Sequence, residues 1–297
     1  GILPSGALHP DLVDRLGDET CTAADQVLRM CIRALDYCPA VDITFEEYLR
    51  AIITADVDLV PDDPFGYRVA FMEAFRARGI PMRSVRTVST ESLTWNTPEI
   101  NDPPWVAKAF AGIDFDLERR ASHHELVLAN EDNRWTLWRM LDQAFAADPE
   151  ACRDLGLEPK LPRFDAHGKI ASPAKSATTF EVFSARPAQR IGPDGTLQRT
   201  IVAVVHQRRP EPFDGKDVAN GFFWFRSGAT LILDANGGKP VIRYAVVKNA
   251  DSQRRLEEQM RMETGGGPAS LRSLYVGGLG RAPFAMMHAE RGEHDHG

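Results

Sequence analysis

The chain lacks three features that would assign it to a broad class at once: a long apolar run, a surplus of basic residues and paired cysteines. No apolar segment approaches the roughly 18–20 residues of a membrane-spanning helix. Acidic residues outnumber basic ones by 42 to 35, which gives a formal charge of −7, whereas nucleic-acid-binding domains are usually basic. We therefore expect neither a membrane-spanning protein nor a nucleic-acid partner.

Only four cysteines are present, and none of them forms a CxxC pair. Three lie in or beside one predicted helix, in which Cys31 and Cys38 are two turns apart and too distant for a disulfide. We expect all four, Cys21, Cys31, Cys38 and Cys152, to be free thiols, and those beside this helix to pack as small apolar side chains. Free thiols agree with a reducing compartment, but the localisation stays open.

Complete catalytic signatures are also missing. The sequence contains no HExxH, no GxSxG, no Walker motif and no strand-following GxGxxG. In the glycine-rich run at 275–281, Gly278 and Gly280 lack the third glycine of a GxGxxG motif, and the run is typical of a loop. We therefore name no catalytic, cofactor-binding or metal-ligating residue in this chain.

What is present is an ordinary globular composition, with 43% apolar residues over a length of 297, which suggests two domains. Hydrophobic periodicity changes from 3.6 to 2 after a proline- and glycine-rich stretch. The pattern predicts an α+β protein in which an all-helical domain precedes an antiparallel hairpin sheet with one or two helices. The expected parts are a helical domain over 1–156, a linker over 157–177 and a β domain over 178–290.

The helical part has several start and stop signals. Thr22 with Asp25 predicts the start of a first helix that ends before Pro39, and Thr44 with Glu47 predicts a capping box for the next. A third helix is expected from near Asp63 to Gly79, and further helices over 104–120 and 122–147. The apolar side chains expected to point inward from the last helix are Leu126, Val127, Trp135, Trp138, Leu141 and Phe145.

The second half is predicted to contain two hairpins and a polar helix. TFEVFSAR and TIVAVVHQ flank the turn sequence IGPDGTLQ, and FFWFRSGATLILD and KPVIRYAVVK flank ANGG. A polar helix over 252–262 precedes GGGP at 265–268.

Histidines give only weak metal signals. His123 and His124 are adjacent, so on a helix their imidazoles point about 100° apart and cannot both bind one ion. We expect them at a helix N-terminus. His288, His294 and His296 near the end of the chain suggest adventitious metal binding at most.

Four carboxylates cluster where one predicted helix ends and the next begins. Helix capping explains Asp62 and Asp63, while acid–base chemistry or a hard cation would also use the cluster. The four are Asp56, Asp58, Asp62 and Asp63. Capping is the favoured interpretation, and the cation site stays open.

Consecutive aromatic residues in a predicted strand provide a possible binding surface. Alternation places Phe223 and Phe225 on one face of the sheet and Phe222 and Trp224 on the other. Core packing explains this pattern, but a peptide- or protein-binding surface beside Arg208, Arg209 and Arg226 is the alternative.

The first three helices resemble a known family. The matching pieces are Ile32-Arg33-Ala34-Leu35, Thr44 to Asp58 and Phe71 to Ile80, within TAADQVLRMCIRALDYCPAVDITFEEYLRAIITADVDLVPDD and YRVAFMEAFRARGI. This order of helices resembles the C-terminal helical domain of thermolysin-like zinc metallopeptidases, the gluzincins. The resemblance covers about 60 residues.

The resemblance implies a chain that supplies the helical lobe, plus an accessory β domain, to a metallopeptidase-related protein. Family members hold zinc with HExxH and a later glutamate, so zinc and catalysis would belong to a catalytic domain upstream of Gly1, the expected partner. The start GILPSG agrees with this expectation. Whether the chain is itself enzymatic stays uncertain, and alone it is expected to be inactive.

The family also uses a histidine before the first of these helices to stabilise the oxyanion. His9 is the only histidine in that region, but its surroundings, ALHPDL, do not match, so we expect a turn residue. A third hypothesis is an independent enzyme with a dispersed site, which requires several of the following residues to meet in one cleft: Asp56, Asp58, His123, His124 and Arg226.

Overall fold

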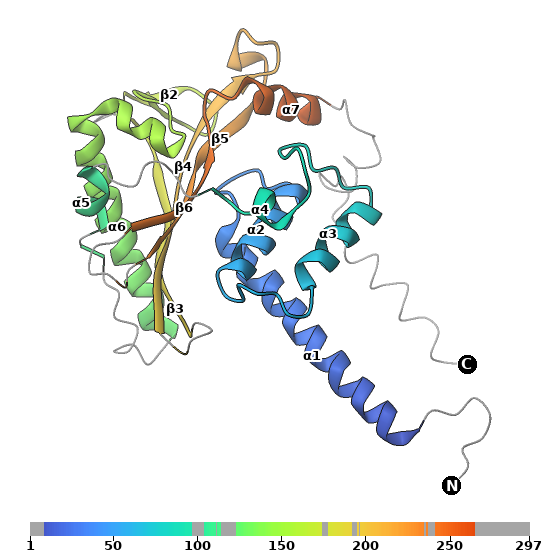
Figure 1. The fold of residues 1–297 in the computed structure, drawn as a ribbon. Coiled ribbons are helices and arrows are strands. Elements are labelled where there is room, and N and C mark those ends of the chain that lie inside the picture. The colour runs from blue at the N-terminus through green and yellow to red at the C-terminus, as the bar shows by residue number, and fades with distance from the viewer. Residues whose placement is uncertain are drawn as a thin grey trace, which may run out of the picture.

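A four-stranded antiparallel sheet stands between two groups of helices in the computed structural model (Figure 1). The structure describes residues 9–96, 104–110, 112–113, 123–173, 178–191, 195, 197–234, 236 and 241–264. Helices come first and antiparallel strands follow, with a helix after the last strand. The predicted α+β class is thus confirmed. No helix in these ranges is long and apolar enough to cross a membrane.

The sheet is a simple meander of β3 (Glu181–Ile191), β4 (Leu197–Pro212), β5 (Phe222–Asp234) and β6 (Val241–Lys248). Both predicted hairpins are confirmed, since β3 pairs with β4 and β5 pairs with β6. Gly228 lies opposite His206 with φ of +150°, and a Cβ there would meet the Val205 carbonyl oxygen at 2.1 Å. Only glycine fits this close approach of β5 to β4.

One face of the sheet is covered by α5 (Pro104–Phe110), α6 (His123–Ala147) and the 3₁₀ segment η2 (Pro149–Leu155). Side chains from α6 also cover the outer edge of β3. Arg134 donates to the Val182 carbonyl at 2.9 Å, and the Asn130 side-chain oxygen accepts from the Ala185 N–H at 3.1 Å. These bonds satisfy backbone groups at an edge that would otherwise be open to pairing.

The opposite face is covered by α1 (Pro10–Ala34), the 3₁₀ segment η1 (Leu35–Tyr37) and α2 (Phe45–Val57). Ile232 and Tyr244 of the sheet share a core with Met30 and Ala34 of α1. On its far side α2 packs through Leu49 and Ile53 against α3 (Tyr67–Ala77) and α4 (Thr90–Leu93). α2 is therefore buried on nearly every side.

The expected linker contains a small two-stranded sheet, β1 (Arg163–Phe164) paired with β2 (Ile170–Ser172). After β6, the chain forms α7 (Gln253–Glu263), close to the predicted polar helix. The predicted glycine break at 265–268 lies outside the described residues. The division into 1–156 and 178–290 stays a prediction.

The predicted start of the first helix was wrong. α1 begins at Pro10, and Thr22 lies inside it with its hydroxyl bonded to the Asp18 carbonyl at 2.9 Å. A proline in the first turn with His9 as N-cap is the start signal that the sequence contained. The capping box of Thr44 and Glu47 is confirmed in full.

Other boundaries moved by a few residues. The third helix begins at Tyr67 rather than near Asp63, although the Asp63 carboxylate accepts from the Tyr67 N–H at 2.9 Å and so caps it. α5 is described over Pro104–Phe110, and positions 114–120 of the predicted helix lie outside the described residues. The short helix α4 lies in a stretch for which no helix was predicted.

Several burial predictions failed. Cys21 is exposed, whereas Cys38 and Cys152 are buried free thiols, and burial raises the pKa of each of these two to about 11. On α6, Leu141 and Phe145 are buried as predicted, but Leu126, Val127 and Trp135 are 38%, 45% and 65% exposed. Trp135 stacks on Trp138 at 5.2 Å between ring centroids.

The helices and the sheet are joined by a buried carboxylate. Asp58, whose side chain is 1% exposed, pairs with Arg243 of β6 at 2.8 Å. It also accepts hydrogen bonds from the hydroxyls of Tyr37 at 2.6 Å and Tyr244 at 2.8 Å. Burial, and then the Asp58 charge, raise the pKa of Tyr244 to about 12. We call Asp58 with these three partners the Asp58 cluster.

Replacing Asp58 should strongly destabilise the fold. Asp58→Ala would leave two buried hydroxyls and the Arg243 guanidinium without their acceptor, which costs on the order of 3–5 kcal/mol. Asp62→Ala is the matched control, because Asp62 is an exposed carboxylate four residues away, and its loss should change stability by less than about 0.5 kcal/mol. Urea unfolding followed by circular dichroism measures both. Equal midpoints for the two variants would contradict the structural role of the cluster.

Candidate functional site

The acidic cluster from the sequence is used for structure. Asp56 is buried and accepts from Nε of the buried Arg68 at 2.7 Å, and Arg68 also donates to the Val60 and Pro61 carbonyls. The Asp63 carboxylate accepts from the Tyr67 and Arg68 N–H groups in the first turn of α3, as the capping interpretation predicted, whereas Asp62 is exposed and makes no such bond among the described residues. Among the described residues, no group of three or more His, Cys, Asp or Glu side chains has the arrangement of a metal site.

The consecutive aromatics alternate as predicted. Phe223 and Phe225 are buried, at 5% and 2% exposure, and Trp224 is partly exposed. The Arg208 guanidinium lies 4.7 Å from the Trp224 ring centroid, and Phe164 and Phe222 contact the ring edge-on. The buried pair confirms core packing for one face, while the binding-surface alternative on the other face stays a prediction.

The residues of a dispersed catalytic site do not meet. Asp56 and Asp58 are held in buried ion pairs. His124 is exposed at the start of α6, which covers the opposite face of the sheet from α2. Arg226 is exposed on β5, and the His123 side chain lies outside the described residues. The third hypothesis therefore loses its motivating geometry.

The remaining histidine predictions have mixed outcomes. His9 is the N-cap of α1, where its Nδ1 accepts from the Asp11 N–H at 3.2 Å. This agrees with the expected local role. The glycine run at 275–281 and the histidines His288, His294 and His296 lie outside the described residues.

A cleft of about 720 Å³ lies between the start of α2, residues 79–84, the end of β6 and α7. This volume is typical of ligand pockets, which span roughly 300–1,000 Å³. We call it the α2–α7 cleft. Its apolar lining includes Phe45, Ile80, Pro81, Val247 and Met262, and its charged lining consists of Glu46, Glu47, Arg50, Arg83, Lys248, Arg254, Arg255, Glu258 and Arg261.

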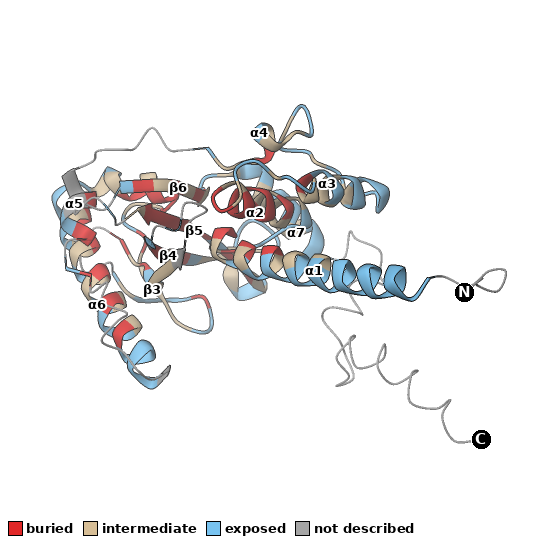
Figure 2. Cartoon of the chain, turned by 60° about the horizontal axis from the view of Figure 1, so that its bottom comes forward, coloured by how far each residue is buried: buried red, intermediate tan, exposed pale blue. Residues whose placement is uncertain are grey.

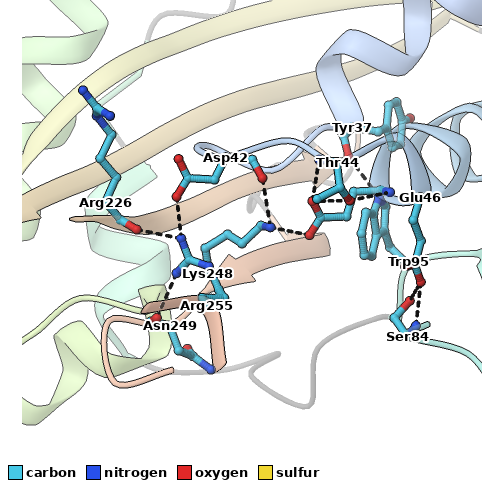
Figure 3. A network of polar contacts seen from close by, with 11 residues as sticks. Tyr37, Asp42, Thr44, Glu46, Ser84, Trp95, Arg226, Lys248, Asn249 and Arg255 are labelled. Carbon is cyan, nitrogen blue, oxygen red and sulfur yellow. Dashed lines mark hydrogen bonds and ion pairs between the residues drawn. The ribbon is translucent and has the colours of Figure 1, made fainter. Parts of the chain in front are cut away.

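Polar contacts fix the walls of the cleft (Figure 3). Glu46 of α2 accepts from the Arg83 N–H at 3.0 Å and from the Ser84 N–H at 2.6 Å. These hydrogen bonds hold the 83–84 segment against α2. They also lower the pKa of Glu46, outweighing the opposing effect of burial.

The other wall joins the sheet to the helices. Lys248 of β6 forms an ion pair with Glu47, the residue that closes the α2 capping box. Arg255 of α7 donates to the Asp42 carboxylate at 2.8 Å, to the Arg226 carbonyl at 2.7 Å and to the Asn249 carbonyl at 3.0 Å. Side chains of α7 thus cover the backbone of β5 where this strand extends past its pairing with β6.

Three arginines of the cleft are left without such partners. Arg83, Arg254 and Arg261 are exposed, and in the part of the chain that the structure describes none of them has an ion pair. Glu258 is also exposed, and among the described residues its carboxylate has neither an ion pair nor a hydrogen bond. No sequence pattern predicted this site, because its arginines come from separate segments and show no local motif.

A second feature is the uncovered face of α1. Beyond α2 the helix projects from the body of the molecule, and its N-terminal part is exposed (Figure 2). Leu12, Leu16 and Val27 are 43%, 51% and 39% exposed. They follow the same helical spacing as the buried Met30 and Ala34, so the apolar stripe that packs on α2 continues past it.

Comparisons with known proteins give no relative. No family model, curated protein or solved structure matches the chain.

Acid should release the 83–84 segment from α2. Because the folded pKa of Glu46 lies below its ordinary value of 4.5, its stabilising effect is present above that value and is lost as the pH falls through the lower folded pKa. The amide proton signals of Arg83 and Ser84 in NMR spectra should shift with a midpoint below 4.5. Glu46→Gln should abolish this titration, and its persistence in that variant would contradict the assignment.

Proposed function

We propose that this chain is the helical lobe, with an accessory β part, of a gluzincin-type zinc metallopeptidase-related protein. In this proposal α1 packs against the catalytic part of the same protein. The order of α1, α2 and α3 supports it, since these helices contain the segments that resemble the family. The observation that carries it is the apolar face of α1, because a helix face of this kind normally packs against a partner.

The character of α1 favours a partner with a basic rim. Residues 10–27 contain one arginine, Arg15, and five acids, which are Asp11, Asp14, Asp18, Glu19 and Asp25. Two copies of α1 packed together would bring like charges close, which is unfavourable. The surface of a different protein part, with an apolar centre and a rim of lysine or arginine, would complement both the apolar stripe of α1 and the acidic residues beside it.

Burial of this stripe would contribute substantially to the free energy of association with a partner. Fully burying a leucine or valine side chain contributes about 1.5–3 kcal/mol, and three exposed side chains of this size lie on the stripe. Most of the stability of a helix in a protein comes from the packing of its apolar face rather than from helix propensity. A partner would therefore also stabilise the helix itself.

The described residues do not fit a zinc site, so no catalytic step is assigned to them. In the proposal the metal ligands and the water-activating glutamate belong to the catalytic part, and this chain contributes the wall beside it. A second candidate is a peptide- or protein-binding module, favoured by the partly exposed Trp224 beneath Arg208.

The encoded protein tests the proposal directly. The reading frame upstream of residue 1 should encode HExxH and a later glutamate, and the full product should hold one zinc ion per chain. The isolated 297-residue chain should hold none by elemental analysis. Stoichiometric zinc in the isolated chain, or an upstream frame without these ligands, would overturn the proposal.

Contact through α1 is tested by limited proteolysis of the full product. Trypsin and chymotrypsin should spare α1 in the full product and cut it in the isolated chain. Leu12→Gln with Leu16→Gln should restore cleavage in the full product, whereas Asp14→Asn with Asp18→Asn, on the polar side, should not. Equal cleavage of α1 in the isolated chain and in the full product would contradict the contact.

A further inference from the structure

We propose that the α2–α7 cleft binds a short acidic peptide segment that also carries apolar side chains. The inference is independent of the metallopeptidase proposal, because it concerns only residues of this chain. It starts from a contrast in charge. The whole chain has a formal charge of −7, yet the lining of this cleft contains six basic residues and three acidic ones.

Internal contacts account for only part of this basic charge. Lys248 is satisfied by Glu47 and Arg255 by Asp42. The Arg50 guanidinium lies 3.9 Å from the Trp95 ring centroid and donates to the Leu93 carbonyl at 3.1 Å. These groups build the walls and are not available to a ligand.

The three arginines that remain point to an anionic ligand. Arg83 comes from the segment held by Glu46, while Arg254 and Arg261 lie about two turns apart on α7. They therefore present guanidinium groups from two sides of the cleft. Guanidinium groups bind carboxylates through paired hydrogen bonds, and Glu258 is the one lining carboxylate left to compete with a ligand.

The apolar lining narrows the ligand class. Phe45 is 65% exposed and Met262 is 75% exposed, and both line the cleft. Exposed phenylalanine and methionine between arginines suit a ligand that has both carboxylates and apolar groups. A small inorganic anion would leave these side chains uncovered, whereas a peptide with alternating acidic and apolar residues would cover them.

The test uses the purified chain and three fluorescein-labelled short peptides measured by fluorescence anisotropy. The glutamate–leucine peptide should bind, and its affinity should fall as salt is raised from about 50 to about 500 mM. The lysine–leucine and glutamate–serine peptides should bind at least about tenfold more weakly. Comparable binding of the lysine–leucine peptide, or no binding of the glutamate–leucine peptide, would overturn the proposal.

Two triple variants locate the site. Arg83→Gln with Arg254→Gln and Arg261→Gln should weaken the glutamate–leucine peptide at least about tenfold. The control removes the same charge elsewhere through Arg15→Gln, Arg139→Gln and Arg163→Gln, which are exposed arginines outside the cleft, and should stay within about twofold of the parent chain.

Both variants should keep the parent circular dichroism spectrum and melting temperature, because all six arginines are exposed. An equal loss of affinity for the glutamate–leucine peptide in the two variants would show only a general attraction between opposite charges. Equal affinity for the glutamate–serine peptide would show a simple anion site. Either result would reject the proposed ligand class.

Discussion

One buried carboxylate holds the two halves of this molecule together. Asp58 ends α2, the most enclosed helix, and binds Arg243 and Tyr244 from the last strand of the sheet. Withdrawing a carboxylate from water is costly, and the cost is met only when its oxygens have partners. The Asp58 cluster meets this condition, and it fixes α2 at one position on the sheet.

Other features depend on that fixed position. With α2 in place, its N-terminus faces the end of β6, so Glu47 closes its own capping box and also reaches Lys248. Glu46, one residue earlier, holds the 83–84 segment on the other side. The α2–α7 cleft is thus a consequence of how α2 is seated, and α1 projects because α2 covers only its C-terminal end.

Local signals in the sequence were enough for most of the larger elements. Alternation and turn residues predicted both hairpins, and the Thr44 capping box predicted the start of α2. These features depend on neighbours a few residues apart. The start of α1 was missed because Thr22 imitates a cap, while Pro10 with His9 gave the better signal.

The candidate site needed information that local patterns do not contain. The role of Asp58 was predicted from the acidic residues near it in the sequence, whereas its hydrogen-bond and ion-pair partners lie in η1 and β6. The arginines of the cleft are single residues in segments far apart in sequence, and only the packing of α7 beside α2 brings them together. Basic residues that packing brings together in this way show no characteristic spacing in the sequence.

The bond between Asp58 and Tyr244 also has a consequence for synthesis, because it joins residues that are 186 positions apart. At about 5–20 residues per second, the ribosome needs roughly 10–40 s to add the intervening chain. During that interval the helices exist without the strand that completes their polar cluster, and the face of α2 that later meets the sheet is exposed. The nascent chain thus passes through a stage in which this exposed apolar surface makes it prone to aggregation.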